Sequence, residues 1–203
     1  MKIWLTAGIM AICFILLGLG IHTEGLQSID RGIGDFFYGL RTESLNPAIK
    51  AVSELGTTTG YIVVFAIVLI ITLLLRRWRT AVWLTVSLAA GWLVNKGLKV
   101  LYHRERPQLW DRLVEPDGFS FPSGNAMVSI AFYGMIALIL LRSRQGWIRA
   151  CGAAVLVIIL LIGLSRLYLG VHYTSDIVGG FLAGGCIAAL CYKGWRSSSD
   201  SIK

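Results

Sequence analysis

The clearest shortage in this 203-residue sequence is charge. Only 15% of the residues are charged, whereas a soluble domain of this size carries about a quarter. Hydrophobic residues make up 56%, and the mean hydropathy is +0.70. One small core cannot bury that much apolar surface, which excludes a soluble globule. The high apolar fraction, with only four prolines, also excludes disordered and collagen-like chains, so a compact polytopic membrane protein remains.

Cysteines and metal-binding motifs are also few. The four cysteines, Cys13, Cys151, Cys186 and Cys191, all fall in apolar stretches, and none forms a CxxC pair. We therefore expect no disulfide and no zinc site, and we interpret these cysteines as small buried packing residues. There is no P-loop and no HExxH-type metal motif, so the sequence implies no metal and no cofactor.

Six apolar stretches approach the roughly 20 residues that a spanning helix needs. They are 3–20, 56–75, 80–95, 124–141, 150–165 and 177–192. The expected fold is all-α: one integral-membrane domain over residues 1–203, built as a six-transmembrane-helix bundle. Within the polar segment 22–55, the amphipathic stretch 33–40 predicts a short helix resting on the membrane surface. Gly180 and Gly184 form a GxxxG pattern, which we interpret as close packing within the bundle rather than a dimer interface.

The net charge of +8 suggests an acidic partner, but its distribution offers another explanation. In a six-span bundle the N-terminus, the 76–79 and 142–149 loops and the C-terminus share one side. That side carries ten basic residues and one acidic residue, against nine basic and ten acidic on the other. The basic counts are nearly even, but the two short, purely basic loops favour cytoplasmic termini. Anionic lipids then explain the excess charge without nucleic acid.

Two polar runs on the opposite side have the chemistry of an anion site. Lys99, His103 and Arg106 stand at i, i+4 and i+7, so they would share one face of a helix that ends at the following proline. A Pro-Ser-Gly turn at Ser123 and Gly124 offers a hydroxyl and free backbone N–H groups at a helix N-terminus, where phosphate binds well. Each run taken alone also has a structural explanation: the cations could simply extend to lipid headgroups, and Ser123 could simply cap the helix.

A third run places His172 and Asp176 four residues apart, with Arg166 upstream. A helical turn would let the carboxylate accept from imidazole Nδ1, leaving Nε2 basic. A lone His–Asp pair is more often structural than catalytic. Together, however, the three runs supply three cations, a hydroxyl, a helix N-terminus and an oriented imidazole. This set suits metal-free phosphoryl transfer with a nitrogen nucleophile.

The order and spacing of these runs resemble the type 2 phosphatidic acid phosphatase superfamily, which comprises integral-membrane lipid phosphate phosphatases. The family pattern is K-x6-R-P, then P-S-G-H, then S-R-x5-H-x3-D. The matching residues are Lys99-x6-Arg106-Pro107, Pro122-Ser123-Gly124-Asn125 and Ser165-Arg166-x5-His172-x3-Asp176. The motifs occupy residues 99–176, and the six-span plan covers the chain.

The resemblance implies a role for each matching position. The residues implied to bind the substrate phosphate are Lys99, Arg106, Ser123, Gly124 and Arg166. His172 would attack phosphorus and form a phosphohistidine, oriented by Asp176, and water would then release phosphate. The implied substrate is a lipid phosphate monoester or pyrophosphate entering from the outer leaflet of a bacterial plasma membrane, at an outward-facing site. Phosphatidylglycerol phosphate is favoured, with phosphatidic acid and undecaprenyl pyrophosphate as the alternatives, and no obligate protein partner is implied.

One position departs from the family pattern. The second-motif histidine, which the family uses to protonate the leaving oxygen, is Asn125 here. An amide is too weak an acid for that step, and general acid catalysis is worth about 10²–10⁴-fold, so we expect impaired activity. Either an introduced His→Asn change or a naturally inactive family member explains it, and His103 is a conceivable substitute donor. A non-catalytic lipid-phosphate binder or carrier therefore stays open; a channel lacks support because the spans hold almost no ionisable residues.

Overall fold

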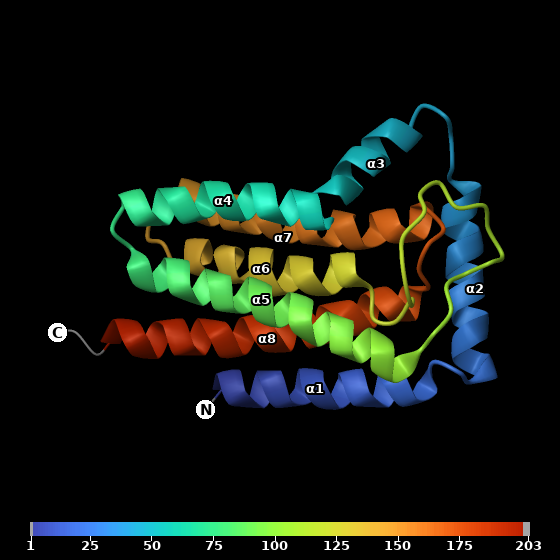
Figure 1. The fold of residues 1–203 in the computed structure, drawn as a ribbon, viewed down its shortest axis with the longest axis horizontal. Coiled ribbons are helices and arrows are strands. Elements are labelled where there is room, and N and C mark those ends of the chain that lie inside the picture. Colours follow the sequence, from blue (N-terminus) through green and yellow to red (C-terminus); the bar gives the residue numbers. More distant parts are fainter. Residues whose placement is uncertain (1, 201–203) are drawn as a thin grey trace.

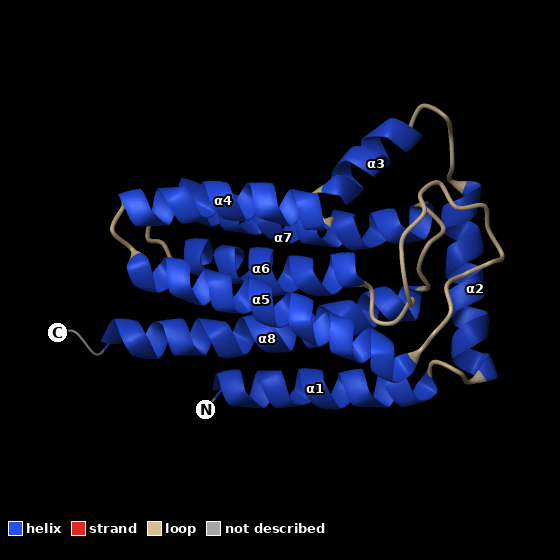
Figure 2. Ribbon diagram, in the orientation of Figure 1, coloured by secondary structure: helices blue, strands red, loops and turns tan. Residues whose placement is uncertain are grey.

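The computed structural model describes residues 2–200, which form eight helices and contain no strand (Figures 1 and 2). The helices are α1 (Lys2–Gly20), α2 (Glu24–Gly39), α3 (Asn46–Glu54), α4 (Thr58–Leu74), α5 (Trp78–Tyr102), α6 (Gly124–Leu141), α7 (Gly146–Tyr168) and α8 (Thr174–Asp200). The all-α prediction is confirmed.

The spanning helices lie side by side as one bundle (Figure 1). Five of them, α1, α5, α6, α7 and α8, are long and apolar enough to cross a bilayer. The sixth, α4, has 17 residues and follows α3 across a 55° bend, and the two helices are long and apolar enough to cross a bilayer when taken as a pair. Large apolar side chains such as Leu19, Leu74 and Leu101 are exposed on the outside of the bundle, as lipid contact requires. The polytopic six-helix prediction is confirmed.

The segment between the first and second spans holds more helix than predicted. α2 begins at Glu24, nine residues before the expected 33–40 stretch, and lies across one end of the bundle (Figure 1). It packs closely there, since a Cβ at Gly34 would lie 2.1 Å from the indole of Trp110. α3 was not predicted at all; it begins with Asn46 and Pro47, a good first-turn residue, and leans against α7.

A sharp turn separates α3 from α4. Thr57 caps α4, because its hydroxyl accepts from the backbone N–H of Gly60 at 3.2 Å. Gly56 allows the close approach of α7, since a Cβ there would lie 2.5 Å from Ile162 Cγ2. The turn therefore directs α3 away from the bundle while its last residues stay beside α6 and α7.

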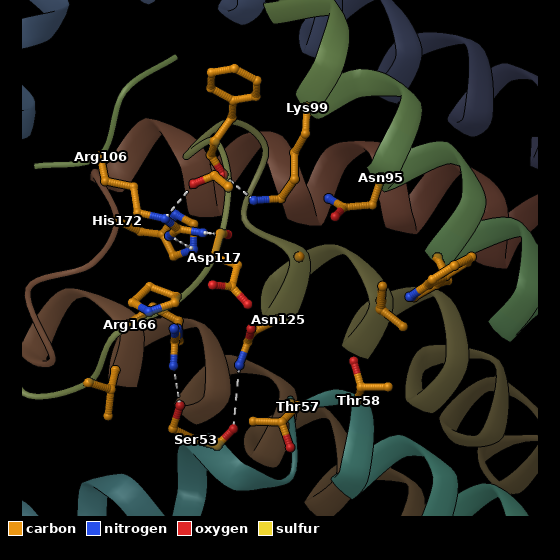
Figure 3. A pocket seen from close by; sticks show the side chains of 18 of the residues that line it. Ser53, Thr57, Thr58, Asn95, Lys99, Arg106, Asp117, Asn125, Arg166 and His172 are labelled. Atoms are coloured by element: carbon orange, nitrogen blue, oxygen red, sulfur yellow. Dashed lines mark hydrogen bonds between the residues drawn. The ribbon is translucent and has the colours of Figure 1, made fainter. Parts of the chain in front are cut away.

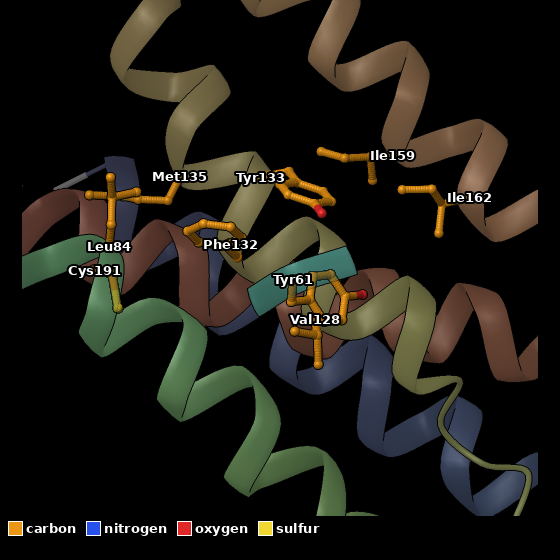
Figure 4. Packing of buried hydrophobic residues seen from close by; sticks show 9 residues of the cluster. All are labelled: Tyr61, Leu84, Val128, Phe132, Tyr133, Met135, Ile159, Ile162 and Cys191. Carbon is orange, nitrogen blue, oxygen red and sulfur yellow. The ribbon is translucent and has the colours of Figure 1, made fainter. Parts of the chain in front are cut away.

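The core is centred on α6, whose Phe132 and Met135 are fully buried. The largest cluster comprises Tyr61, Leu84, Val128, Phe132, Tyr133, Met135, Ile159, Ile162 and Cys191 (Figure 4). α8 packs against α6 through glycines: a Cβ at Gly180 would lie 2.9 Å from Ser123 O, and one at Gly184 would lie 2.1 Å from Met127 O. The GxxxG pattern therefore packs inside the bundle, as interpreted from the sequence.

The loops separate into two groups at opposite ends of the bundle. The start of α1, the end of α8 and the α4–α5 and α6–α7 connections lie at one end (Figure 1). α2 and the segments 103–123 and 169–173 lie at the other. This is the grouping expected from the charge distribution, although Lys203, counted on the basic side, lies outside the described residues.

The cysteines differ from expectation in one respect. All four are free, but only Cys191 is buried; Cys13 and Cys151 are exposed and Cys186 is partly exposed. The prediction that all four are buried packing residues is therefore wrong for Cys13 and Cys151. Their helix faces point outward, where a small apolar thiol suits lipid as well as it suits a protein core.

Candidate active site

A cavity of about 660 Å³ opens at the α2 end of the bundle. The end of α3, the start of α4, the second half of α5, the start of α6 and the 114–119 loop form its walls. Lys99, Arg106, Asn125, Arg166 and His172 line it (Figure 3). The fold therefore brings residues from all three sequence motifs to one cavity.

His172 is buried in the loop before α8, with Asp176 behind it in the first helical turn. Nδ1 donates to Asp176 Oδ2 at 3.3 Å, and the same carboxylate oxygen accepts from the Tyr173 backbone N–H at 2.8 Å. Ser120 Oγ also donates to Oδ2 and lies 3.2 Å from Nδ1. We assign the proton to Nδ1 from this network, so the Nε2 lone pair faces the cavity.

The imidazole of His172 is held in its neutral form. Burial is the main cause that lowers the pKa of His172 to about 3; the hydrogen bond to Asp176 opposes the shift, and the charge of Arg106 adds to it. Arg106 Nη1 lies 3.1 Å from Nε2, close enough to donate to its lone pair. A neutral imidazole with a directed lone pair has the form that a nitrogen nucleophile needs.

The first motif reaches the cavity by a different path than predicted. α5 ends at Tyr102, and His103 takes a left-handed conformation with φ 46°, which stops the helix before Arg106. The predicted helical stripe is therefore wrong beyond Lys99. The His103 ring packs on Phe119, with centroids 4.6 Å apart, and lines a separate cavity, so it is not placed to replace the missing acid.

Backbone carbonyls of the 117–119 segment hold two of the cations at the cavity. Lys99 Nζ donates to Phe119 O, while Arg106 donates through Nε to Gly118 O at 2.9 Å and through Nη2 to Asp117 O at 2.8 Å. Burial, the largest effect, lowers the pKa of Arg106 to about 10, so the guanidinium stays charged at neutral pH. A bound anion would find both groups already in position.

The second motif forms the N-terminus of α6. Ser123 holds the N-cap position, but its hydroxyl makes no capping bond; buried Oγ has no hydrogen-bond partner among the described residues. Its backbone N–H donates to Asp176 O at 2.9 Å, which ties the second motif to the third. Simple capping by Ser123 is therefore excluded, and an unpartnered buried hydroxyl is available to a ligand.

Gly124 is placed by a buried amide on α5. A Cβ at Gly124 would lie 3.0 Å from Asn95 Oδ1, while Asn95 Nδ2 donates to Pro122 O at 3.1 Å. This bond anchors the turn that presents the first N–H groups of α6.

Arg166 enters the cavity from the end of α7. Its Nη1 donates to Ser53 Oγ of α3 at 2.6 Å, and its buried Nε has no partner among the residues described. Ser53 also contacts Asn125, whose Nδ2 donates to the Ser53 carbonyl at 3.4 Å. The half-buried Asn125 side chain therefore faces the cavity beside the cation (Figure 3).

Several residues of the site were missed by sequence reasoning. They are Asp30, Ser53, Asn95, Arg104 and Ser120. Arg104 stands inside the unspecified positions of the first motif, and Asn95 is a polar residue at the end of an apolar stretch; both were signals. Asp30, Ser53 and Ser120 lie in polar segments where one more acid or hydroxyl carries no signal.

Residues 2–200 contain no group of three or more His, Cys, Asp or Glu side chains that could hold a metal ion. Five cations and three carboxylates line the cavity, and the excess of positive charge suits an anion. The cations are Lys50, Lys96, Lys99, Arg106 and Arg166, and the carboxylates are Glu54, Glu115 and Asp117.

Comparison with known proteins identifies the family. A model of the PAP2 superfamily matches residues 80–199, which include all three motifs. The chain belongs to the PAP2 superfamily. It is 31% identical to phosphatidylglycerophosphatase B of Bacillus subtilis (strain 168) over 84% of this chain and 85% of that protein. An undecaprenyl-diphosphatase of Sulfolobus acidocaldarius is 30% identical, over 72% of this chain and 69% of that protein.

The fold is also shared with solved PAP2 structures. The crystal structure of a PAP2 type phosphatidylglycerolphosphate phosphatase from Bacillus subtilis superposes with a TM-score of 0.86 at 27% identity, over 98% of each chain. LpxE of Aquifex aeolicus shares the fold, with a TM-score of 0.65 over 80% of this chain and 93% of that one. These relatives place the PAP2 chain among the multi-pass membrane lipid phosphatases.

Proposed function

We propose that this PAP2 chain hydrolyses the phosphate monoester of a membrane lipid through a phosphohistidine at His172, with phosphatidylglycerol phosphate as the favoured substrate. The observation that carries the proposal is the combination of a neutral, oriented imidazole with two unsatisfied buried donors. Ser123 Oγ and Arg166 Nε have no partner among the described residues. Arg166 lines the cavity, and Ser123 directly precedes Gly124, which also lines it. Because buried polar groups are almost always hydrogen-bonded, an anion that accepts from both would complete the site.

The proposed first step forms a bond between His172 Nε2 and phosphorus. Arg106 Nη1 exchanges its contact with Nε2 for a phosphate oxygen, which frees the Nε2 lone pair to attack. The ester P–O bond breaks, and the leaving oxygen takes its electron pair and requires a proton. The imidazole keeps the proton on Nδ1, which donates a hydrogen bond to Asp176, and the ring becomes positively charged. Lys99, Arg106 and Arg166 stabilise the equatorial phosphate oxygens, where negative charge concentrates.

The second step returns the enzyme to its starting state. Water attacks phosphorus and gives its proton to the solvent, the N–P bond breaks, and its electron pair returns to Nε2. Inorganic phosphate leaves the cavity. No metal ion enters either step, so chelators should not reduce turnover.

Asn125 limits the first step in this proposal. Its amide lies where the family places the proton donor and can only donate a hydrogen bond to the leaving oxygen. The proton must then come from water or another donor, which slows departure of an alkoxide more than that of an acidic phenol.

Two further lysines support a substrate with a second negative charge. Lys50 of α3 and Lys96 of α5 line the same cavity and are exposed at its walls. Phosphatidylglycerol phosphate carries a phosphodiester besides its terminal monoester, whereas phosphatidic acid carries the monoester alone. A pyrophosphate also brings two charges, so hydrolysis of undecaprenyl pyrophosphate is the second candidate, consistent with the activity named for the Sulfolobus relative.

The proposed setting is a bacterial plasma membrane with both termini in the cytoplasm and the cavity facing outward, working as one domain. The basic loops at the end of the bundle opposite the cavity support this orientation. Trp92 and Val100 line the cavity and are 45% and 62% exposed on the outside of α5, so acyl chains can stay in lipid while the headgroup enters. Labelling of a cysteine introduced at Glu115 from the cytoplasmic side alone would contradict this orientation.

The test is phosphate release by Asn125→His in detergent, with phosphatidylglycerol phosphate, phosphatidic acid and undecaprenyl pyrophosphate compared in the presence of a chelator. We expect release to be fastest with phosphatidylglycerol phosphate and to disappear when His172→Ala is added. Tight binding of lipid phosphates without any turnover would support a non-catalytic binder instead. Activity lost on chelation would refute the metal-free steps.

A further inference from the structure

A buried arginine outside the proposed phosphate site links α2 to the catalytic pair. Arg104, in the loop after α5, is 5% exposed and donates from Nη1 to Asp176 Oδ1 at 2.7 Å. Nη2 donates to Asp30 Oδ2 at 2.8 Å. The guanidinium also stacks over the Tyr173 ring, 4.3 Å from its centroid. One fork-shaped cation thus bridges two carboxylates that lie 146 positions apart in the sequence.

Asp30 completes the network from the middle of α2, where it is 1% exposed. Its Oδ1 accepts from the Ser175 backbone N–H at 2.8 Å, and its Oδ2 accepts from the Ser175 hydroxyl at 2.5 Å. α2 therefore supplies the acceptor for an N–H in the first turn of α8, next to the residue that orients the imidazole.

The two oxygens of Asp176 have separate partners. Oδ2 faces the imidazole side and accepts from His172, Ser120 and Tyr173. Oδ1 accepts from Arg104 alone among the residues described. Arg104 therefore fixes the rotation of the carboxylate plane, and so the direction of its bond to Nδ1.

We propose that Arg104, anchored by Asp30, is a positioning residue that keeps Asp176 ionised and the His172 proton on Nδ1. This inference rests on the phosphohistidine mechanism. Without Arg104, the carboxylates of Asp30 and Asp176 would face one buried site with no cation between them, and one of them would take up a proton. A protonated Asp176 donates to Nδ1 instead of accepting, which moves the imidazole proton to Nε2 and removes the attacking lone pair.

The charges around this network are consistent with such a role. The cations whose charge acts on His172 or Asp176 are Lys99, Arg104, Arg106 and Arg166, and Asp30 forms an ion pair with Arg104. Burial would lower the pKa of Arg104, but Asp176 and Asp30 outweigh it, so the guanidinium stays charged. In the phosphohistidine state the two carboxylates face two positive groups, Arg104 and the imidazolium. The network is thus electrically balanced in the intermediate, and because the imidazolium charge already develops in the transition state before it, this balance lowers the barrier.

The kinetic test uses Arg104→Gln in the Asn125→His background, with a lipid phosphate as substrate. Partners that orient a reactive group typically contribute about 10–100-fold, so we expect kcat to fall by about that factor with little change in KM. Adding Asp30→Asn should recover about tenfold, because Asp176 no longer competes with a second carboxylate. Arg31→Gln, which removes an exposed cation next to Asp30 on the same helix, should change neither constant.

A purely structural network predicts the opposite for the double variant, since losing Asp30 as well would add to the damage. An unchanged kcat in Arg104→Gln, or a further loss in the double variant, would overturn the inference. If the Asn125→His parent itself releases no phosphate from any lipid, the proposed function fails, and that outcome is distinct from failure of the inference.

A second measurement needs no turnover. The chain has three histidines, so nitrogen NMR with His22→Gln and His103→Gln as assignment controls isolates the signal of His172. In the chain that keeps Asn125, we expect the Nδ1–H tautomer both without further change and in Arg31→Gln, and the Nε2–H tautomer in Arg104→Gln. An Nδ1–H tautomer in a folded Arg104→Gln protein would contradict the proposal. If that variant does not fold, Arg104→Lys keeps the charge but bonds only one carboxylate, and a mixture of tautomers is then expected.

Discussion

Replacing Asn125 by histidine should restore the proton donor of the first step. The structure has room for the ring on one side only. A Cβ at Gly56 would lie 3.0 Å from Asn125 Nδ2, so the larger side chain must extend into the cavity, where Asn125 is already half-exposed. The Ser53 carbonyl, 3.4 Å from Nδ2, can accept from one ring nitrogen and orient the other toward the leaving oxygen.

The expected gain follows from the role of that nitrogen. General acid catalysis contributes about 10²–10⁴-fold, or roughly 3–5 kcal/mol of transition-state stabilisation. We expect an increase in kcat of that order for a lipid phosphate, whose leaving alkoxide is strongly basic. An aryl phosphate needs little protonation of its leaving group, so its rate should rise far less.

The assay is phosphate release by the two proteins with both substrates at matched detergent concentration. Asn125→Gln, which keeps the amide on a side chain one methylene longer, is the matched control and should show no increase in kcat. An equal increase for alkyl and aryl phosphates would mean that the ring acts through binding, and no increase for either would refute the assignment of this position to the proton donor.

Three further predictions test the surroundings of the site. Ser53→Ala removes the hydroxyl that holds Arg166 and should raise KM about tenfold, since a hydrogen bond to a charged group is worth about 1.5–3 kcal/mol; steady-state kinetics measures this. Because burial lowers the pKa of His172 to about 3, its NMR signal should remain that of a neutral ring from pH 8 to about 5. Because the pKa of His172 in the folded protein lies below its usual value, the free energy of unfolding should not depend on this group above about pH 6.5 and should decrease as the pH falls toward 3. A titration midpoint of His172 near pH 6.5 in the folded protein would contradict this. Gly184→Ala, facing a backbone carbonyl at 2.1 Å, should lower stability by about 1–3 kcal/mol in thermal melts, whereas Gly97→Ala, with no atom within 4 Å, should not.

The spanning helices were predictable because long apolar stretches in a chain with little charge have one physical solution, the hydrogen-bonded helix in lipid. α3 was not, because its nine residues mix polar and apolar side chains in a stretch too short to span a membrane, and its helix packs against α7. The end of α5 was misjudged for a local reason. The helix stops at His103 through one left-handed residue, and the proline that suggested its end comes four positions later.

The sequence motifs predicted several of the residues that line the cavity, but most of the contacts that hold these residues could not be predicted. His172 and Asp176 are four residues apart, so their pairing follows from local geometry. The bond from Ser53 to Arg166 joins residues 113 positions apart, and the Arg104–Asp30 pair spans 74. Such contacts depend on where α2 and α3 pack, and no spacing rule in one sequence specifies that.

The central claim is that His172 carries the phosphoryl group. The most direct measurement is the intact mass of the Asn125→His protein after rapid quenching at alkaline pH during turnover of phosphatidylglycerol phosphate, with His172→Ala treated identically. We expect a mass increase of one phosphoryl group that maps to His172, is lost on mild acid treatment and is absent from His172→Ala. Turnover without any phosphoryl-enzyme on the turnover timescale, or an adduct that persists in His172→Ala, would contradict it.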